Sequence, residues 1–119
     1  HQRLYFDFYQ AAPVEKEPPA IGGLTPLKQV YRYEPVPDTL PREKHRYIVG
    51  SQGQLWTEYM PSMKHVEYRG FPRICALAEV VWQKKGKKDY TDFVRRLAVH
   101  RTRLDALGIT CHPPEEEEA

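Results

Sequence analysis

Apolar residues along this chain recur with two spacings, which predict two kinds of secondary structure. Residues 3–9 alternate in character, and a β-branched run that begins at Tyr47 continues to about residue 56. Both patterns are typical of β-strands. A stretch rich in proline and glycine, residues 11–23, follows the first strand and cannot hold a regular element. The sequence therefore predicts two strands, each followed by a long connection.

Apolar residues three or four positions apart predict helices between and after these strands. Three helices span about residues 26–34, 63–69 and 89–107, and a further segment after Pro72 carries Ile74, Leu77, Ala78 and Val81 on one stripe. Thr25 and Asp89 are suitable N-cap residues, and Gly108 stands where a last helix would end. The order strand, helix, strand, helix is that of an α/β fold with parallel strands, which places ligand-binding groups at the carboxyl ends of the strands.

Size and charge narrow the possible classes of protein. The chain has 119 residues, of which 40% are hydrophobic, and this suits one packed domain. The net charge is only +2, and the lysine-rich run at residues 84–88 has no interleaved aromatic residues, so we expect no nucleic-acid partner. No apolar run approaches the roughly 18 to 20 residues that a membrane span needs. We also expect no metal or cofactor, because no His/Cys cluster has zinc spacing.

The two cysteines, Cys75 and Cys111, do not form a CxxC motif. Cys75 lies in an apolar helical pattern, and Cys111 follows the last predicted helix. We expect both to remain as thiols. A single disulfide between them stays an alternative, because the sequence does not show how far apart they lie in space.

Each predicted strand carries an aromatic residue and an acid two positions apart. Tyr5 and Asp7 form one pair, and Trp56 and Glu58 form the other. Residues i and i+2 of a strand point to the same side, so each pair offers a ring and a charged acceptor to one ligand, which suits a sugar. The alternative is that the rings are ordinary strand aromatics and the acids are solvated edge charges.

A longer set of motifs resembles a known family. They are Leu4-Tyr5-Phe6-Asp7, Tyr31-Arg32-Tyr33-Glu34-Pro35-Val36-Pro37, Gln52-Gly53-Gln54-Leu55-Trp56-Thr57-Glu58, His65-Val66-Glu67-Tyr68, Phe71-Pro72-Arg73 and Ala76-Leu77-Ala78-Glu79-Val80-Val81-Trp82. In this order they resemble the family 20 glycoside hydrolases, the β-N-acetylhexosaminidases. The resemblance implies that residues 1–108 are the last two βα units of a (β/α)8 barrel with a C-terminal helix, an incomplete part of a fold of about 250 residues. Residues 109–119 are then an acidic tail.

The resemblance also implies a mechanism, in which the substrate's own acetamido oxygen attacks the anomeric carbon with retention of configuration. Tyr5 would hold that acetamido group, Asp7 and Glu58 would accept hydrogen bonds from sugar hydroxyls, and Trp56 would form the floor under the sugar. The family's Asp-Glu catalytic pair does not occur in this sequence. We therefore expect this chain to supply a sugar cradle and to be inactive by itself.

The partners follow from the same resemblance. They are a glycan ending in N-acetylhexosamine, and either the remainder of the barrel or further copies of the chain, which would cover unpaired strand edges. The resemblance implies a secreted or periplasmic parent protein, although nothing in the sequence fixes the compartment. The alternative is an independent, non-catalytic carbohydrate-binding or interaction module.

Overall fold

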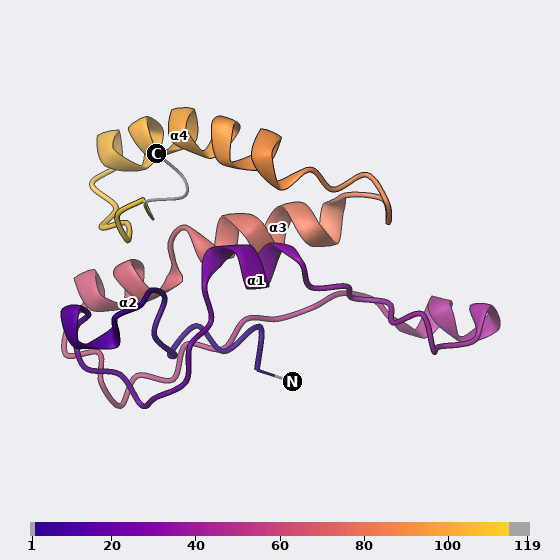
Figure 1. The fold of residues 1–119 in the computed structure, drawn as a ribbon, viewed down its shortest axis with the longest axis horizontal. Coiled ribbons are helices and arrows are strands. Elements are labelled where there is room, and N and C mark those ends of the chain that lie inside the picture. Colours follow the sequence, from indigo (N-terminus) through magenta and orange to yellow (C-terminus); the bar gives the residue numbers. More distant parts are fainter. Residues whose placement is uncertain (1, 115–119) are drawn as a thin grey trace.

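A computed structural model describes residues 2–114 of the chain, and its regular elements are helices. Their order is η1 (Val14–Lys16), α1 (Leu27–Tyr31), η2 (Arg42–Tyr47), α2 (Met63–Gly70), α3 (Arg73–Trp82) and α4 (Tyr90–Ala106), where η denotes a 3-10 helix. In Figure 1, α4 lies along one side of the molecule and α1 lies beside α3 beneath it. The chain between α1 and α2 projects as an arm with η2 near its tip, and residues 41–50 are all exposed.

The predicted helices are confirmed, with small shifts at their ends. Helix α4 begins after Asp89, whose carboxylate accepts the amide of Asp92 at 3.0 Å, and it ends before Gly108 at φ 73°. Helix α1 begins one residue later than expected, because the Thr25 hydroxyl donates to the Gln2 carbonyl at 3.0 Å and Pro26 takes the N-cap position. The helix also ends at Tyr31 rather than near residue 34.

The two predicted strands are wrong as regular elements. Within residues 2–114 the chain forms only isolated parallel bridges, between Tyr5 and Gln54 and between Tyr9 and Leu24. A turn after Tyr5, in which the Phe8 amide donates to the Tyr5 carbonyl at 3.2 Å, replaces the extended run. A strand needs a row of neighbouring hydrogen bonds, and each segment meets its partner only at one position. The parallel direction was correct, whereas Tyr47 ends a 3-10 helix instead of starting a strand.

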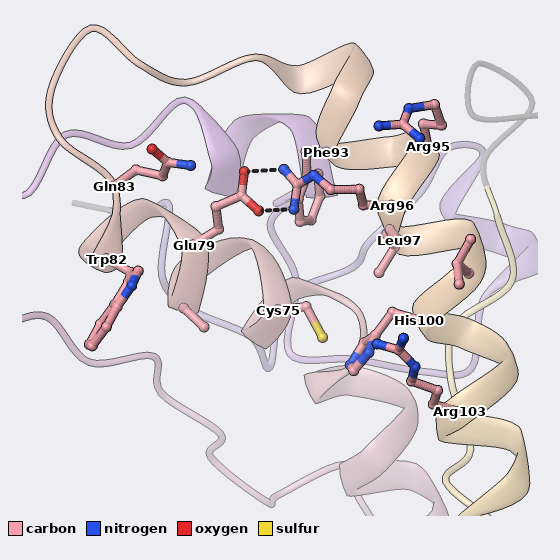
Figure 2. Close-up of a pocket in the computed structure, with 12 residues that line it drawn as sticks. Cys75, Glu79, Trp82, Gln83, Phe93, Arg95, Arg96, Leu97, His100 and Arg103 are labelled. Atoms are coloured by element: carbon pink, nitrogen blue, oxygen red, sulfur yellow. Dashed lines mark hydrogen bonds and ion pairs between the residues drawn. The ribbon is translucent and has the colours of Figure 1, made fainter.

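The core lies where α1, α3 and α4 meet. Val30 and Ala76 are fully buried there, and Phe6 and Leu97 pack into the same cluster. Glu79 on α3 accepts two hydrogen bonds of 2.7 Å from the Arg96 guanidinium on α4 (Figure 2). This paired geometry fixes the position of α4 over α3, because both guanidinium nitrogens must meet both carboxylate oxygens.

The C-terminal segment, residues 109–112, returns to the body of the protein. The Thr110 amide donates to the Glu67 carboxylate at 2.8 Å, and the His112 amide donates to the Phe71 carbonyl at 3.0 Å. The glutamates expected to form an acidic tail, residues 115–118, lie outside the described residues. The boundary expected at residue 108 therefore stays a prediction, with residues 109–112 packed against α2.

In the described range, residues 2–114, no helix is long and apolar enough to cross a membrane. The same residues hold no group of three or more His, Cys, Asp or Glu side chains arranged to bind a metal ion.

Candidate functional site

The two segments that carry the predicted sugar-binding residues meet at one parallel bridge. The Phe6 amide donates to the Gln54 carbonyl, and the Gln54 amide donates to the Leu4 carbonyl, both at 2.8 Å. Gly53 allows this approach, since a Cβ atom at that position would lie 2.4 Å from the Phe6 ring. The bridge therefore aligns Tyr5 with Gln54, with Asp7 and Trp56 following on their two segments.

Asp7 is the most unusual residue of the four. Its side chain is 6% exposed, and its Oδ1 atom is buried without a hydrogen-bond partner among the described residues. Burial raises the pKa of Asp7, and the neighbouring Glu58 carboxylate raises it further, while Arg73 and Arg69 act in the opposite direction. Buried polar atoms are nearly always hydrogen-bonded, so this oxygen is available to a ligand that brings a donor.

Glu58 lies close enough to Asp7 to act on its pKa, and thus the structure brings these two predicted acids together. Glu58 is exposed and lines a hollow of about 300 Å³. Pro18 and Pro19 of the long loop form part of the wall, and His65 of α2 lies at the same hollow.

The two predicted aromatic residues are placed differently. Tyr5 stacks on Phe8, with ring centroids 5.3 Å apart, and lines a separate hollow with Tyr33 and Gln54. Trp56 is 58% exposed. Among residues 2–114, no hydrogen bond or ring contact joins Trp56 to the other three predicted residues. The four side chains thus lie on neighbouring segments, and within residues 2–114 the interaction found between them is the electrostatic one between the two acids.

Arg73 holds the backbone around Asp7 in place. Its guanidinium is fully buried and donates to the carbonyls of Phe6, Phe8 (3.2 Å) and Thr25 (3.1 Å). Burial and the neighbouring Arg69 cation lower the pKa of Arg73 to about 9. This α3 side chain therefore replaces, on one side of the segment, the backbone donors that an adjacent strand would provide.

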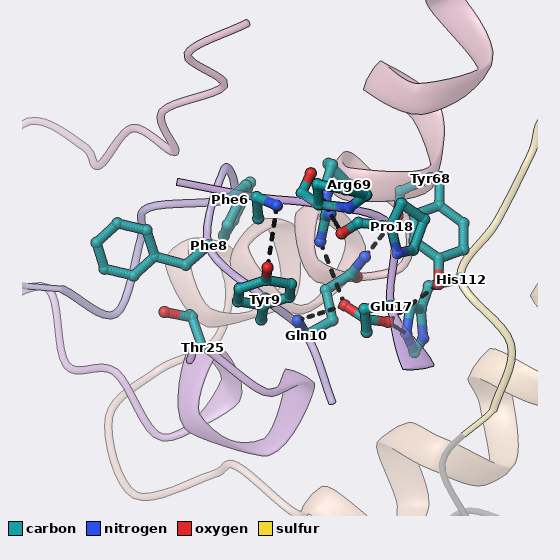
Figure 3. A network of polar contacts seen from close by, with 12 residues as sticks. Phe6, Phe8, Tyr9, Gln10, Glu17, Pro18, Thr25, Tyr68, Arg69 and His112 are labelled. Atoms are coloured by element: carbon teal, nitrogen blue, oxygen red, sulfur yellow. Dashed lines mark hydrogen bonds and ion pairs between the residues drawn. The ribbon is translucent and has the colours of Figure 1, made fainter. Parts of the chain in front are cut away.

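A second buried network fastens the long loop that follows Asp7 (Figure 3). Glu17 lies 2.5 Å from His112 Nε2 and 3.2 Å from Arg69 Nη1, and its carboxylate also accepts from the Tyr68 hydroxyl at 3.0 Å. Burial would raise the pKa of Glu17, but the hydrogen bonds with His112, the Gln10 amide and Tyr68 outweigh it and lower the pKa to about 2.

Sequence reasoning missed both networks. Arg73 was visible only as part of the Phe71-Pro72-Arg73 motif, and Glu17 stood in a stretch classed as irregular loop. A buried arginine in an otherwise apolar helix pattern was the available signal for Arg73, because an unpaired buried charge is costly and demands partners.

The chain is similar in sequence and in structure to known glycoside hydrolases. The sequence model described as "Glycosyl hydrolase family 20, catalytic domain" matches residues 1–85. A β-hexosaminidase of Porphyromonas gingivalis is 48% identical over 115 residues, which cover 97% of this chain and 15% of that protein. The β-hexosaminidase subunit beta of Mus musculus is 30% identical over 86 residues, covering 72% of this chain and 16% of that protein.

Solved structures give the same result. The crystal structure of an exo-β-N-acetylglucosaminidase from Vibrio harveyi in complex with N-acetylglucosamine superposes with a TM-score of 0.79 at 31% identity. It covers 97% of this chain and 18% of that enzyme. A second structure, of a β-N-acetylhexosaminidase, has a TM-score of 0.78 at 28% identity and covers 99% of this chain and 25% of its own.

These relatives are glycoside hydrolases, and they define the class. The chain belongs to glycoside hydrolase family 20. It spans about 15% of the length of the curated relatives that it matches first.

Proposed function

We propose that this chain is the C-terminal part of the catalytic barrel of a β-N-acetylhexosaminidase, which removes terminal non-reducing N-acetylhexosamine residues by substrate-assisted, retaining hydrolysis. The chain supplies the sugar cradle. The Asp-Glu pair that protonates the leaving group and orients the acetamido group comes from another part of the enzyme, since the sequence contains no such dipeptide.

Each predicted residue has a distinct role in the cradle. The Tyr5 hydroxyl donates to the acetamido oxygen and holds this internal nucleophile near the anomeric carbon, where positioning alone can lower the barrier substantially. Asp7 and Glu58 accept hydrogen bonds from sugar hydroxyls, and each such bond to a charged group contributes about 1.5–3 kcal/mol. The indole of Trp56 stacks against the apolar face of the ring.

The observation that carries this proposal is the Oδ1 atom of Asp7, which is buried, has no hydrogen-bond partner in the described part of the chain and feels the charge of Glu58. A protein that only needed a stable interior would not leave a buried carboxylate oxygen without a hydrogen-bond donor. Sugar hydroxyls are suitable donors, because they satisfy both acids without adding charge.

A chimeric enzyme tests the proposal. The segment of the Porphyromonas gingivalis β-hexosaminidase that matches this chain is replaced by the chain itself, and hydrolysis of a chromogenic N-acetylglucosaminide is measured. We expect an active chimera, in which Asp7→Asn and Glu58→Gln each lower kcat/KM by about 10- to 100-fold.

The controls for this experiment are exposed acids of the same chain. Asp105→Asn and Glu43→Gln, which change the same functional groups away from the hollow, leave kcat/KM unchanged. Equal activity of the Asp7 and Glu58 variants and their controls would contradict the cradle assignment.

The isolated chain distinguishes the catalytic proposal from the alternative of an independent carbohydrate-binding module. Without the Asp-Glu pair and most of the barrel wall, we expect neither hydrolysis nor saturable binding of N-acetylglucosamine by calorimetry. Binding with a defined stoichiometry would favour the non-catalytic module instead.

The proposed barrel partner has support on the surface of the chain. Large apolar side chains remain exposed on several elements, including Val49 (96%), Trp82 (91%), Leu107 (75%) and Met63 (69%). Such residues usually mark contacts with other protein surfaces when they gather in patches. We expect the isolated chain to self-associate and the chimera to be monodisperse, which sedimentation measurements on both would compare.

A further inference from the structure

The C-terminal segment, residues 109–112, runs beside the start of α3. The His112 amide donates to the Phe71 carbonyl at 3.0 Å, and Phe71 lies four residues before Cys75, just ahead of the first turn of α3. Cys111 is the neighbour of His112 in this segment. The two cysteines, 36 positions apart in sequence, are therefore brought to the same end of α3.

Arg101 on α4 is a neighbour that the two thiols share. Its Nη1 atom donates to the Cys111 sulfur at 3.1 Å and to the His112 carbonyl at 2.5 Å. The same guanidinium acts electrostatically on Cys75, and so does the Cys111 thiol itself. Both cysteines are partly exposed, and they form no disulfide in this structure.

Cys75 also faces an accessible groove. In Figure 2 its sulfur points away from α3 toward α4, near His100. The groove between these helices has a volume of about 730 Å³ and is bordered by the cationic side chains of Arg95 and Arg103. A small anionic oxidant can therefore reach Cys75 from solvent through the groove, and Cys111 is itself partly exposed.

We propose that Cys75 and Cys111 form a site of reversible cross-linking, in which a disulfide joins the C-terminal segment to the first turn of α3. The oxidant is a small-molecule disulfide such as oxidised glutathione. The site lies apart from the predicted sugar-binding residues, so the inference does not depend on the proposed enzymatic role.

The exchange proceeds in two balanced steps. The Cys111 thiolate attacks one sulfur of oxidised glutathione, the S–S bond breaks, and one glutathione thiolate leaves with the electron pair. Cys75 then loses its proton to solvent and attacks the Cys111 sulfur of the mixed disulfide, which releases the second glutathione thiolate. Two protein thiols are oxidised, and one glutathione disulfide is reduced to two thiols.

The environments of the two thiols fix the order of these steps. Burial and the neighbouring Cys111 raise the pKa of Cys75 to about 11. At Cys111 the Arg101 guanidinium is in direct contact and favours the thiolate. Cys111 is therefore the attacking thiol, and ring closure by Cys75 is the slow step at neutral pH.

The cross-link changes how the last helix unfolds. All of α4 lies between the two cysteines in sequence, so the disulfide would tie both of its ends to α3. Closing a loop of this size restricts the unfolded chain, and we expect the melting temperature to rise by about 10 °C.

The test is an equilibration of the chain with reduced and oxidised glutathione at pH 8, followed by acid quenching and mass spectrometry of proteolytic peptides. We expect a single intramolecular product that has lost two hydrogens and joins the Cys75 and Cys111 peptides. Its equilibrium constant against glutathione should be at least about tenfold larger in native buffer than in urea, because the fold holds the thiols together. An equal or smaller native constant would overturn the proposal, as would separate glutathione adducts or intermolecular dimers as the only products.

Variants test the assigned roles of the two cysteines and Arg101. Cys75→Ser should accumulate the mixed disulfide on Cys111, whereas Cys111→Ser should react several-fold more slowly. Arg101→Gln should slow the first step several-fold, and Arg42→Gln, an exposed arginine of η2 that does not border the groove, should not. Equal rates for the two arginine variants would contradict the role given to Arg101, and faster modification of Cys75 than of Cys111 would contradict the order of attack.

Discussion

The helical half of this protein and the half that carries the predicted sugar-binding residues, residues 4–9 and 50–58, differ in how far each is packed and hydrogen-bonded. Helices α1, α3 and α4 bury Val30 and Ala76 fully between them and are joined by the paired Glu79–Arg96 contact. The segments that carry the predicted cradle share one bridge at Tyr5 and leave Trp56 58% exposed, and one oxygen of Asp7 has no hydrogen-bond partner among residues 2–114. Among the described residues, the helical half is packed and paired internally, whereas the other half makes few contacts between its segments.

The difference follows from where each element finds its hydrogen bonds. A helix satisfies its backbone groups internally, whereas a strand depends on neighbouring strands for the same groups. The proposed origin of the chain in the last part of a barrel accounts for this difference, because such a part would keep its helices and lose its sheet. What remains of the strand path is held by side chains from the helical half, Arg73 above all.

Removing the Arg73 side chain, which links the two halves, should have the largest effect on stability. Arg73→Met leaves the carbonyls of Phe6, Phe8 and Thr25 without their donor and should destabilise the chain by about 4 kcal/mol. Urea unfolding followed by circular dichroism measures this loss. Arg103→Met, an exposed arginine on α4, is the control and should change stability by less than about 0.5 kcal/mol. Similar stabilities would show that the two halves are not coupled through Arg73.

Weakening the network around Glu17, which fastens the long loop, should have the next largest effect on stability. Glu17→Gln removes a buried carboxylate that contacts Arg69 at 3.2 Å and should cost about 3 kcal/mol at neutral pH. Because the pKa of Glu17 is lowered to about 2, its contribution is complete above pH 4.5 and is lost as the pH falls toward 2. The difference between wild type and variant should therefore shrink over this range.

Acid unfolding curves of the two proteins measure this change. Glu15→Gln, an exposed glutamate in the same loop, should follow the wild type throughout. A difference between wild type and Glu17→Gln that stays constant from pH 7 to pH 2 would contradict the assigned role of the carboxylate.

Two glycine substitutions compare a closely packed position with an open one in the half that carries the predicted sugar-binding residues. Gly53→Ala places a Cβ atom 2.4 Å from the Phe6 ring and should cost about 1–3 kcal/mol. Gly50→Ala meets nothing within 4 Å and should leave the free energy of unfolding nearly unchanged. If both substitutions had the same effect on urea unfolding, the close approach of these segments would not be a feature of the folded chain.

The smallest expected effect on stability is an increase, whereas the preceding substitutions are expected to lower it. Because the pKa of Asp7 is raised in the folded chain, its ionised form is less stable there than in the unfolded chain. Asp7→Asn should therefore raise stability by about 1 kcal/mol at pH 7, and this gain should vanish as the pH falls through the folded pKa to the unfolded value of 3.8. Thermal melts at several pH values measure the effect, and Asp105→Asn is the exposed control. A loss of stability at pH 7 would show that the carboxylate serves packing rather than a ligand.

The helices could be predicted from the sequence because their signals are local. Apolar spacing, the Asp89 cap and Gly108 all lie within a few residues of the element that they define. The absence of regular strands could not be predicted from the sequence, since an alternating pattern such as residues 3–9 becomes a strand only when a neighbouring segment pairs with it along its length. Here a turn after Tyr5 takes its place.

The candidate site was predictable in part for the same reason. The spacing of two residues singled out Asp7 and Glu58, whose charges interact in the structure, while their role in sugar binding stays a prediction. The sequence could not show that Arg73 would be the support of this site, because its acceptors are carbonyls up to 67 positions away. Nor could it connect Glu17 with His112, which are separated by 95 positions.

Hydrogen exchange tests the central claim most directly. The claim is that residues 4–9 and 50–58 need the rest of the proposed barrel to form regular β-strands. Amide exchange of residues 4–9 and 50–58 would be compared between the isolated chain and the chimeric hexosaminidase, with α3 as the internal reference. We predict rapid exchange of both segments in the isolated chain and strong protection in the chimera, while α3 is protected in both. Equal protection of these segments in the two proteins would contradict the account.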